Sequence, residues 1–246
     1  MNSNKRSNQQ NVDNLEVLTE KATTFTPGYD PSEERLSIAN HKLLKISGDQ
    51  VLLNVVTTER ACDNAISARN AAFDSFDSLV TRAINALRIS EVPDQTISQG
   101  ESIVRDLRNK RASEIDTPAK SEEGTENEES PKTNKIRGGS FNTKIENFRK
   151  FIVLLSTIPA YKPKEADLTV DSLYEKLESL KQANAVFVTA DAVAEAARRQ
   201  RDLVLYAGKT GLVDIAMDSK LYVKSAYGAT SPQYKSISGL LFTRPR

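Results

Sequence analysis

Few side chains in this chain are of the types that most enzyme chemistry requires. The sequence contains one histidine, His41, and one cysteine, Cys62. Zinc sites use several Cys or His ligands, and di-iron carboxylate bundles take a histidine from each of two helices, so neither site can be assembled here. Nothing beside His41 or Cys62 resembles a nucleophile turn or an oxyanion site. We therefore predict a non-enzymatic protein with no catalytic residue, no metal ligand and no cofactor.

The tripeptide Gly208-Lys209-Thr210 resembles the end of a phosphate-binding loop. Such a loop needs a second glycine five residues before the Gly-Lys pair, and Leu203 occupies that position. It also needs a strand before it, whereas the preceding residues have a helical pattern. We interpret the tripeptide as a helix C-terminus, with the lysine near the carbonyl end of the helix dipole.

Basic residues gather toward the C-terminal end and form the one candidate binding face. They are Arg198, Arg199, Arg201, Lys220, Lys224 and Lys235. A basic face interleaved with tyrosines is typical of surfaces that contact a phosphate backbone or stack on bases. However, the formal net charge of the chain is only +1 at pH 7, which does not indicate strong, salt-dependent binding. We favour a solvated face, or one that pairs with the acidic first half.

Charge is distributed unevenly along the chain. Residues 1–135 hold 17 Lys and Arg against 22 Asp and Glu, which gives −5, and residues 136–246 hold 17 against 11, which gives +6. Much of the negative excess lies in a segment rich in Glu, Ser, Thr and Pro with almost nothing to bury. We predict a disordered acidic linker over 112–139 and a disordered N-terminal lead over 1–11.

One pattern of roughly a hundred residues occurs on both sides of this linker. Tyr29 and Tyr161 lie in one matched segment, and other matched positions are likewise 132 or 133 residues apart. We therefore predict two tandem-duplicated helical units, residues 12–111 and 140–246. The two units are expected to pack as one body.

The composition favours helices over strands, because Trp is absent and Ala, Leu, Lys, Glu and Arg are plentiful. The expected fold is an all-α, elongated helical bundle with long antiparallel helices. A run without Gly or Pro over 163–207 predicts one helix of about forty residues. Helix starts are predicted at Asp30–Glu33, at Thr143 and at Ser231, and Gly48 is expected to interrupt or bend a helix.

Several short segments of the second unit are distinctive. They are Ile145–Phe148, Tyr161–Glu165, Gly211–Ala216, Tyr222–Ser225 and Gly228–Lys235, with Tyr206 and, more faintly, Ile97–Arg111. Together they are similar to a family of uncharacterised bacterial helical-bundle proteins. The resemblance implies a helical fold. It carries no activity and no catalytic residue.

Helix packing explains every well-patterned segment of the chain. We therefore expect a structural or protein–protein interaction protein, a scaffold that binds a protein partner or associates with itself. One alternative is a nucleic-acid-associated protein that uses the C-terminal basic face. A second is a membrane-active bundle in which residues 151–158 insert after a conformational change. With no signal-like stretch and no apolar run of about eighteen residues, we expect a cytoplasmic protein without a transmembrane segment.

Overall fold

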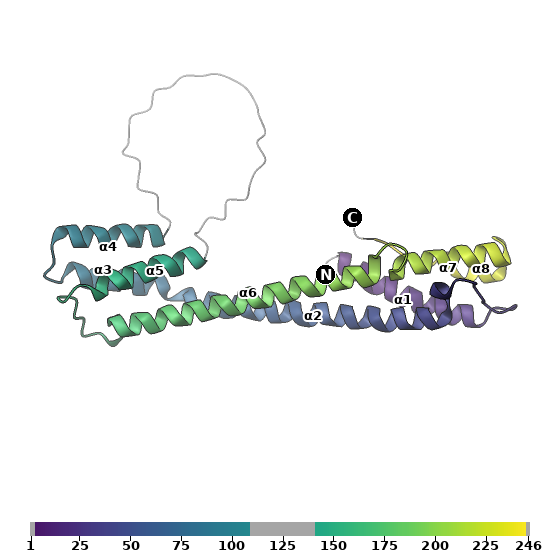
Figure 1. Cartoon of the computed structure of the whole chain (residues 1–246), viewed down its shortest axis with the longest axis horizontal. Helices are drawn as coiled ribbons and strands as arrows, with labels where there is room; N and C mark the ends of the chain where they lie inside the picture. The colour runs from purple at the N-terminus through teal and green to yellow at the C-terminus, as the bar shows by residue number, and fades with distance from the viewer. Residues whose placement is uncertain (1–2, 109–140, 245–246) are drawn as a thin grey trace, which may run out of the picture. The chain divides into compact units, whose positions relative to one another are not determined.

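The computed structural model describes residues 3–108 and 141–244, and every regular element in these ranges is a helix (Figure 1). The α-helices are α1 (Ser3–Thr23), α2 (Ile38–Asp74), α3 (Phe76–Arg88), α4 (Asp94–Leu107), α5 (Phe141–Ser156), α6 (Val170–Tyr206), α7 (Leu212–Tyr227) and α8 (Pro232–Ser238). Two short 3-10 helices, η1 (Glu34–Leu36) and η2 (Ala166–Leu168), precede α2 and α6. The predicted all-α class is confirmed. The predicted linker over 112–139 lies outside the described residues.

The chain divides into two compact units, and each takes helices from both halves of the sequence. Unit 1 consists of Met1–Asn64 and Thr189–Arg246, and unit 2 consists of Ala65–Val188. Unit 1 thus combines α1 and the start of α2 with the end of α6, α7 and α8. Unit 2 combines α5 and the start of α6 with the end of α2, α3 and α4. The predicted repeat boundaries stay a prediction about the sequence, and the compact units cut across them.

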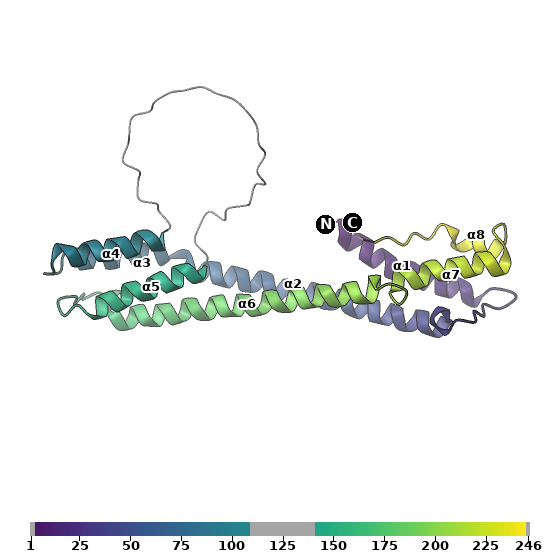
Figure 2. The ribbon, with the colours of Figure 1, turned by 45° about the horizontal axis from the view of Figure 1, so that its top comes forward.

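Unit 1 is built around apolar contacts among α1, α6 and α7, which lie close together in Figures 1 and 2. Val12 and Leu15 of α1 pack with Leu205 of α6 and with Leu212 and Val213 of α7, and all five are fully buried. A second cluster joins the end of α1 to α7 and α8. These contacts hold residues from the two ends of the chain in one core.

The first turns of α1 are anchored by the C-terminal segment, so the prediction of a disordered lead is wrong for residues 3–11. Asn11 is buried, and its Nδ2 donates to the carbonyl oxygen of Thr243 at 2.8 Å. The Thr243 amide donates back to Asn11 Oδ1 at 2.9 Å. The side chain therefore pairs with a backbone unit far away in sequence, a contact that a local pattern does not reveal.

Unit 2 has a larger, aromatic core. Phe76 of α3 and Phe148 of α5 meet edge to face, with ring centroids 4.9 Å apart. Leu173, Leu177 and Leu180 of α6 are buried against them, as the near-heptad pattern of this helix predicts.

Both long helices begin at a hydroxyl residue just after the 3-10 helix. Ser37 Oγ accepts a hydrogen bond from the Asn40 amide at 3.2 Å, and Thr169 Oγ1 accepts one from the Ser172 amide at 3.3 Å. Each helix has 37 residues, close to the length predicted for the second. The predicted helix start at Asp30–Glu33 is wrong, because that segment lies before η1.

Other predicted helix ends are mixed. Gly228 ends α7 with φ 91°, and Ser231 Oγ accepts from the Tyr234 amide at the start of α8, so both predictions are confirmed. Lys209 has a positive φ of 65° in the turn after α6, consistent with a helix C-terminus. The predicted start at Thr143 is wrong, because α5 already begins at Phe141.

Gly48 does not interrupt α2, which runs through it as one helix. A Cβ atom added at this position would lie 2.9 Å from Val12 Cγ2 and 3.4 Å from Leu212 Cδ1. The missing side chain therefore allows α1 to approach α2 closely.

Unit 1 and unit 2 share a tyrosine contact at the spacing seen in the sequence. Tyr29 Oη donates to the carbonyl oxygen of Leu36 at 2.8 Å in unit 1, and Tyr161 Oη donates to that of Leu168 at 2.8 Å in unit 2. Burial raises the pKa of each of these tyrosines to about 12. In both units the hydroxyl closes the extended segment onto its 3-10 helix.

An ion pair recurs in the two units with its charges exchanged. Arg35 Nη1 lies 2.7 Å from Asp218 Oδ2 of α7, and Arg82 Nη2 of α3 lies 2.9 Å from Asp167 Oδ1. Arg35 and Asp167 are 132 residues apart, so Asp218 and Arg82 correspond, 136 residues apart. The first residues of α7 and α3 have this same spacing of 136. The pair therefore sets the correspondence between α7 and α3.

Candidate interaction surfaces

The single histidine is a core residue of unit 1. His41 is fully buried, its Nε2 lies 2.9 Å from Ser219 Oγ on α7, and its ring lies beside that of Tyr29. Desolvation by burial lowers the pKa of His41 to about 4. The corresponding residues of unit 2 are Leu173 and Ala83, both buried. Packing alone therefore fills the same place in the other unit.

Cys62 is also a buried residue of α2, and its Sγ lies 4.0 Å from Asp191 Oδ1. Across residues 3–108 and 141–244, the acidic, His and Cys side chains form no group of three or more that could hold a metal ion.

The three candidate arginines of the basic face lie on α6 in unit 1, and each contacts a carboxylate. The pairs are Arg198–Glu59 at 3.3 Å, Arg199–Glu195 at 3.3 Å and Arg201–Asp202 at 2.7 Å. The Glu59 partner comes from α2, and the other two partners come from α6 itself. These guanidinium groups are therefore already neutralised by neighbours within the unit.

The candidate lysines lie on α7 and α8, and two of them are engaged with the protein. Lys220 Nζ donates to the carbonyl oxygens of Ser238 and Leu240 at 3.0 and 2.6 Å, and burial lowers its pKa. Lys224 Nζ lies 5.9 Å from the ring centroid of Tyr234, while Lys235 is exposed. The six predicted residues thus do not present one uninterrupted cationic face.

A more distinctive surface feature of unit 1 is a set of exposed apolar side chains on α2. Leu43, Ile46 and Leu53 are 63%, 52% and 68% exposed, and Gln50 between them is also exposed. We call these four residues the α2 stripe. Their spacing of three, four and three residues places them along one helix face, as in the seam of a coiled coil.

The face of α2 that points into unit 1 is a different one. His41, Gly48, Val55 and Cys62 are buried and follow one another at intervals of seven residues. Leu53 is two residues from Val55, which at about 100° per residue places the two side chains on opposite sides of the helix. The α2 stripe is therefore directed away from the core of its unit.

The corresponding positions of α6, 132 residues later, have a different character. They are Glu175, Glu178, Gln182 and Ala185, and all are exposed. Charged and small residues are what a solvated helix face normally carries. Against this internal comparison, the apolar residues of the α2 stripe stand out.

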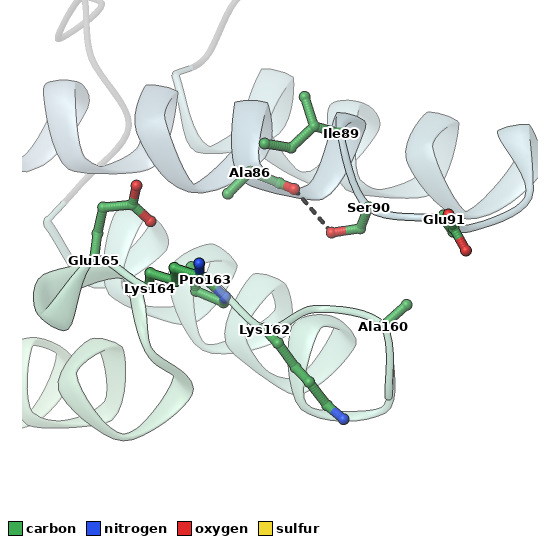
Figure 3. Close-up of a pocket in the computed structure, with 9 residues that line it drawn as sticks. All are labelled: Ala86, Ile89, Ser90, Glu91, Ala160, Lys162, Pro163, Lys164 and Glu165. Atoms are coloured by element: carbon green, nitrogen blue, oxygen red, sulfur yellow. Dashed lines mark hydrogen bonds between the residues drawn. The ribbon is translucent and has the colours of Figure 1, made fainter.

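Unit 2 has a surface hollow of about 500 Å³ beside the end of α3, which we call the α3 hollow. Figure 3 shows Ala86, Ile89 and Ser90 on one side and residues of the loop between α5 and α6 on the other. Its lining residues are Ala86, Ile89, Ser90, Glu91, Ala160, Lys162, Pro163, Lys164 and Glu165. Ser90 Oγ donates to the Ala86 carbonyl oxygen at 2.9 Å, so this hydroxyl is engaged with its own helix.

The segment 151–158, expected to insert into membranes in one alternative, packs in the core of unit 2. Phe151, Ile152 and Leu155 are essentially inaccessible to solvent, while Val153 is exposed. No helix in the described part of the chain is both long and apolar enough to span a membrane.

Sequence reasoning missed both the α2 stripe and the α3 hollow. The spacing of Leu43, Ile46 and Leu53 is visible in the sequence, but these residues were expected to face a core. The hollow depends on Ala86, whose small size matters only once α3 is compared with α7. Both signals required knowing which helix faces are covered.

Comparison with protein-family models, with curated proteins and with solved structures found no match. The resemblance to a bacterial helical-bundle family therefore gains no support from these comparisons.

Proposed function

We propose that this chain is a non-enzymatic interaction protein that associates with a second copy of itself through the α2 stripe. The observation that carries the proposal is the exposure of Leu43, Ile46 and Leu53 on one face of one helix. Burying such residues against another apolar helix face is favourable by roughly 1.5–3 kcal/mol for each fully covered side chain.

The spacing and the charges at the stripe favour a copy of the same helix as the partner. The interval of three and four residues is what two helices need to interlock side chains along a seam. Lys42 and Asp49 border the stripe with opposite signs, so the surface has no excess charge that would select a strongly charged partner. Gln50 supplies a polar residue within the seam, a device that sets helix register at some cost in stability.

We also infer that the two halves of the sequence arose by tandem duplication. Supporting observations are the matched tyrosine contacts of Tyr29 and Tyr161, the two long helices of equal length and the ion pair with exchanged charges. In this account each compact unit pairs the hairpin of one copy with terminal helices of the other. The two copies are thereby interlocked.

The test is the solution mass of the full chain by size-exclusion chromatography with light scattering. The wild type should give twice the chain mass of 27.2 kDa, with little change on raising the salt concentration. A variant with Leu43→Glu, Ile46→Glu and Leu53→Ala carries what α6 carries at the matched positions and should be a monomer.

The control variant changes Val193→Gln and Leu203→Gln on α6, which removes exposed apolar residues elsewhere in unit 1. It should remain a dimer. A monomeric wild type would contradict the proposal. A complex with nucleic acid that high salt dissociates would instead favour the basic face as the functional surface.

A further inference from the structure

The α3 hollow has a filled counterpart in unit 1, and the difference lies in one residue. By the spacing of 136 between α7 and α3, Ala86 corresponds to Tyr222. In unit 1 the ring of Tyr222 packs edge to face on Tyr29, with centroids 5.2 Å apart. Tyr161, which corresponds to Tyr29, has only the methyl group of Ala86 at that place on α3. An aromatic ring is therefore what the hollow lacks.

The mouth of the hollow also differs in charge between the units. Lys162 and Lys164 correspond to Asp30 and Ser32 in unit 1, while Pro163 corresponds to Pro31. Both lysines are exposed, and both line the hollow. The loop thus keeps its proline but exchanges an acidic and a neutral side chain for two cations. This exchange favours a ligand with negative charge beside its ring.

A third difference extends the apolar part of the site. Ile89 is 87% exposed at the edge of the hollow, and its counterpart on α7 is Ser225. With Ala86, Ala160 and Pro163, it lines a hollow large enough for an aromatic side chain.

We propose that the α3 hollow binds an aromatic side chain flanked by acidic residues, presented by a partner polypeptide. The ring takes the place that Tyr222 fills in unit 1, and the acidic flanks lie near Lys162 and Lys164. The site uses residues of unit 2 only and does not depend on the α2 stripe. Self-association and peptide binding can therefore fail separately.

The test is an NMR titration of the full chain with methyl-labelled alanine and isoleucine. The probe is the peptide acetyl-Glu-Glu-Tyr-Glu-Glu-amide, and a second peptide carries Ala in place of Tyr. The Tyr peptide should shift the methyl signals of Ala86 and Ile89 in a saturable way, and the Ala peptide should bind roughly tenfold more weakly or not at all. Equal shifts with both peptides, or none with either, would overturn the proposal.

Variants separate the ring from the charges. Ala86→Tyr restores the residue found in unit 1 and should abolish peptide binding while raising the melting temperature. Lys162→Asp with Lys164→Ser restores the unit 1 charges and should weaken binding without changing the fold. As a second measurement, 4-hydroxyphenylacetate alone should bind more weakly than the Tyr peptide. Peptide binding retained in Ala86→Tyr, or a small aromatic anion that binds as tightly as the peptide, would contradict the proposal.

Discussion

At the scale of single residues, His41 shows how a residue type associated with chemistry serves as packing. Its ring is fully buried against Ser219 and Tyr29, and its Nδ1 has no hydrogen-bond partner. Leu173 and Ala83 fill the corresponding place in unit 2 without any polar atom in their side chains. The histidine therefore imposes a pH dependence on unit 1 that unit 2 lacks.

We predict that unit 1 loses stability as the pH falls from about 6.5 toward 4. The pKa of His41 in the folded chain, about 4, lies below its ordinary value of 6.5, so the unfolded chain binds more protons in this range. The free energy of unfolding should fall by up to about 3 kcal/mol across it. Urea denaturation of the full chain at a series of pH values measures this loss.

The matched control is His41→Leu with Ser219→Ala, which installs the unit 2 pair in unit 1. This variant should be at least as stable as the wild type at pH 7, and it should lose less stability on acidification. Carboxylates that titrate in the same range are common to both chains and cancel in the comparison. An identical pH dependence in wild type and variant would exclude His41 as its source.

At the scale of elements, much of the helix pattern could be predicted from the sequence. The run over 163–207 indicates a helix that closely matches α6, and the spacing of Tyr29 and Tyr161 marks segments that make the same hydrogen bond. The helix starts could not be predicted well. Asp30–Glu33 fits a capping box locally, but Tyr29 closes the extended segment onto η1 and moves the start of α2 to Ile38.

Exposure was also beyond the sequence, because it depends on which neighbours cover a face. Leu43 and Ile46 have the spacing of a core stripe, yet the buried residues of α2 are His41, Gly48, Val55 and Cys62. The candidate basic residues were visible as types, but not the carboxylates that neutralise three of them.

Gly48 is predicted to be required by the contact between α1 and α2. Gly48→Ala gains about 1 kcal/mol of helix propensity, but the new Cβ would meet Val12 Cγ2 at 2.9 Å, and a valine side chain adjusts poorly. The substitution should therefore lower the free energy of unfolding by about 1 kcal/mol or more. In a Val12→Ala background the same change should stabilise the chain. Stabilisation of the wild type by Gly48→Ala would show that the close approach is not limiting.

The ion pair with exchanged charges makes a second prediction about elements. Arg35→Asp alone should cost up to about 1 kcal/mol, because Asp218 then faces another carboxylate. Adding Asp218→Arg should recover most of that loss, since it reproduces the order of charges in the Asp167–Arg82 pair. A double-mutant cycle by urea denaturation measures the coupling. Zero coupling would mean that the exposed pair contributes nothing to the contact between η1 and α7.

At the scale of the whole molecule, the account is of two units that interlock the halves of the chain, each with its own surface for contacts. Unit 1 exposes the α2 stripe, and unit 2 contains the α3 hollow. Both features are departures of one unit from the other, and neither is explained by packing within its own unit. This is why we place function in contacts rather than in chemistry.

The most direct test of the central claim is a spin-label distance measurement on the α2 stripe. A single label at Gln50→Cys in a Cys62→Ala background gives a dipolar signal only when two copies meet. We predict a narrow, short inter-chain distance for this label, and a longer or absent one for a label at Gln182→Cys, the matched position on α6. Isolated spins at both positions, or a short distance at Gln182→Cys only, would contradict association through α2.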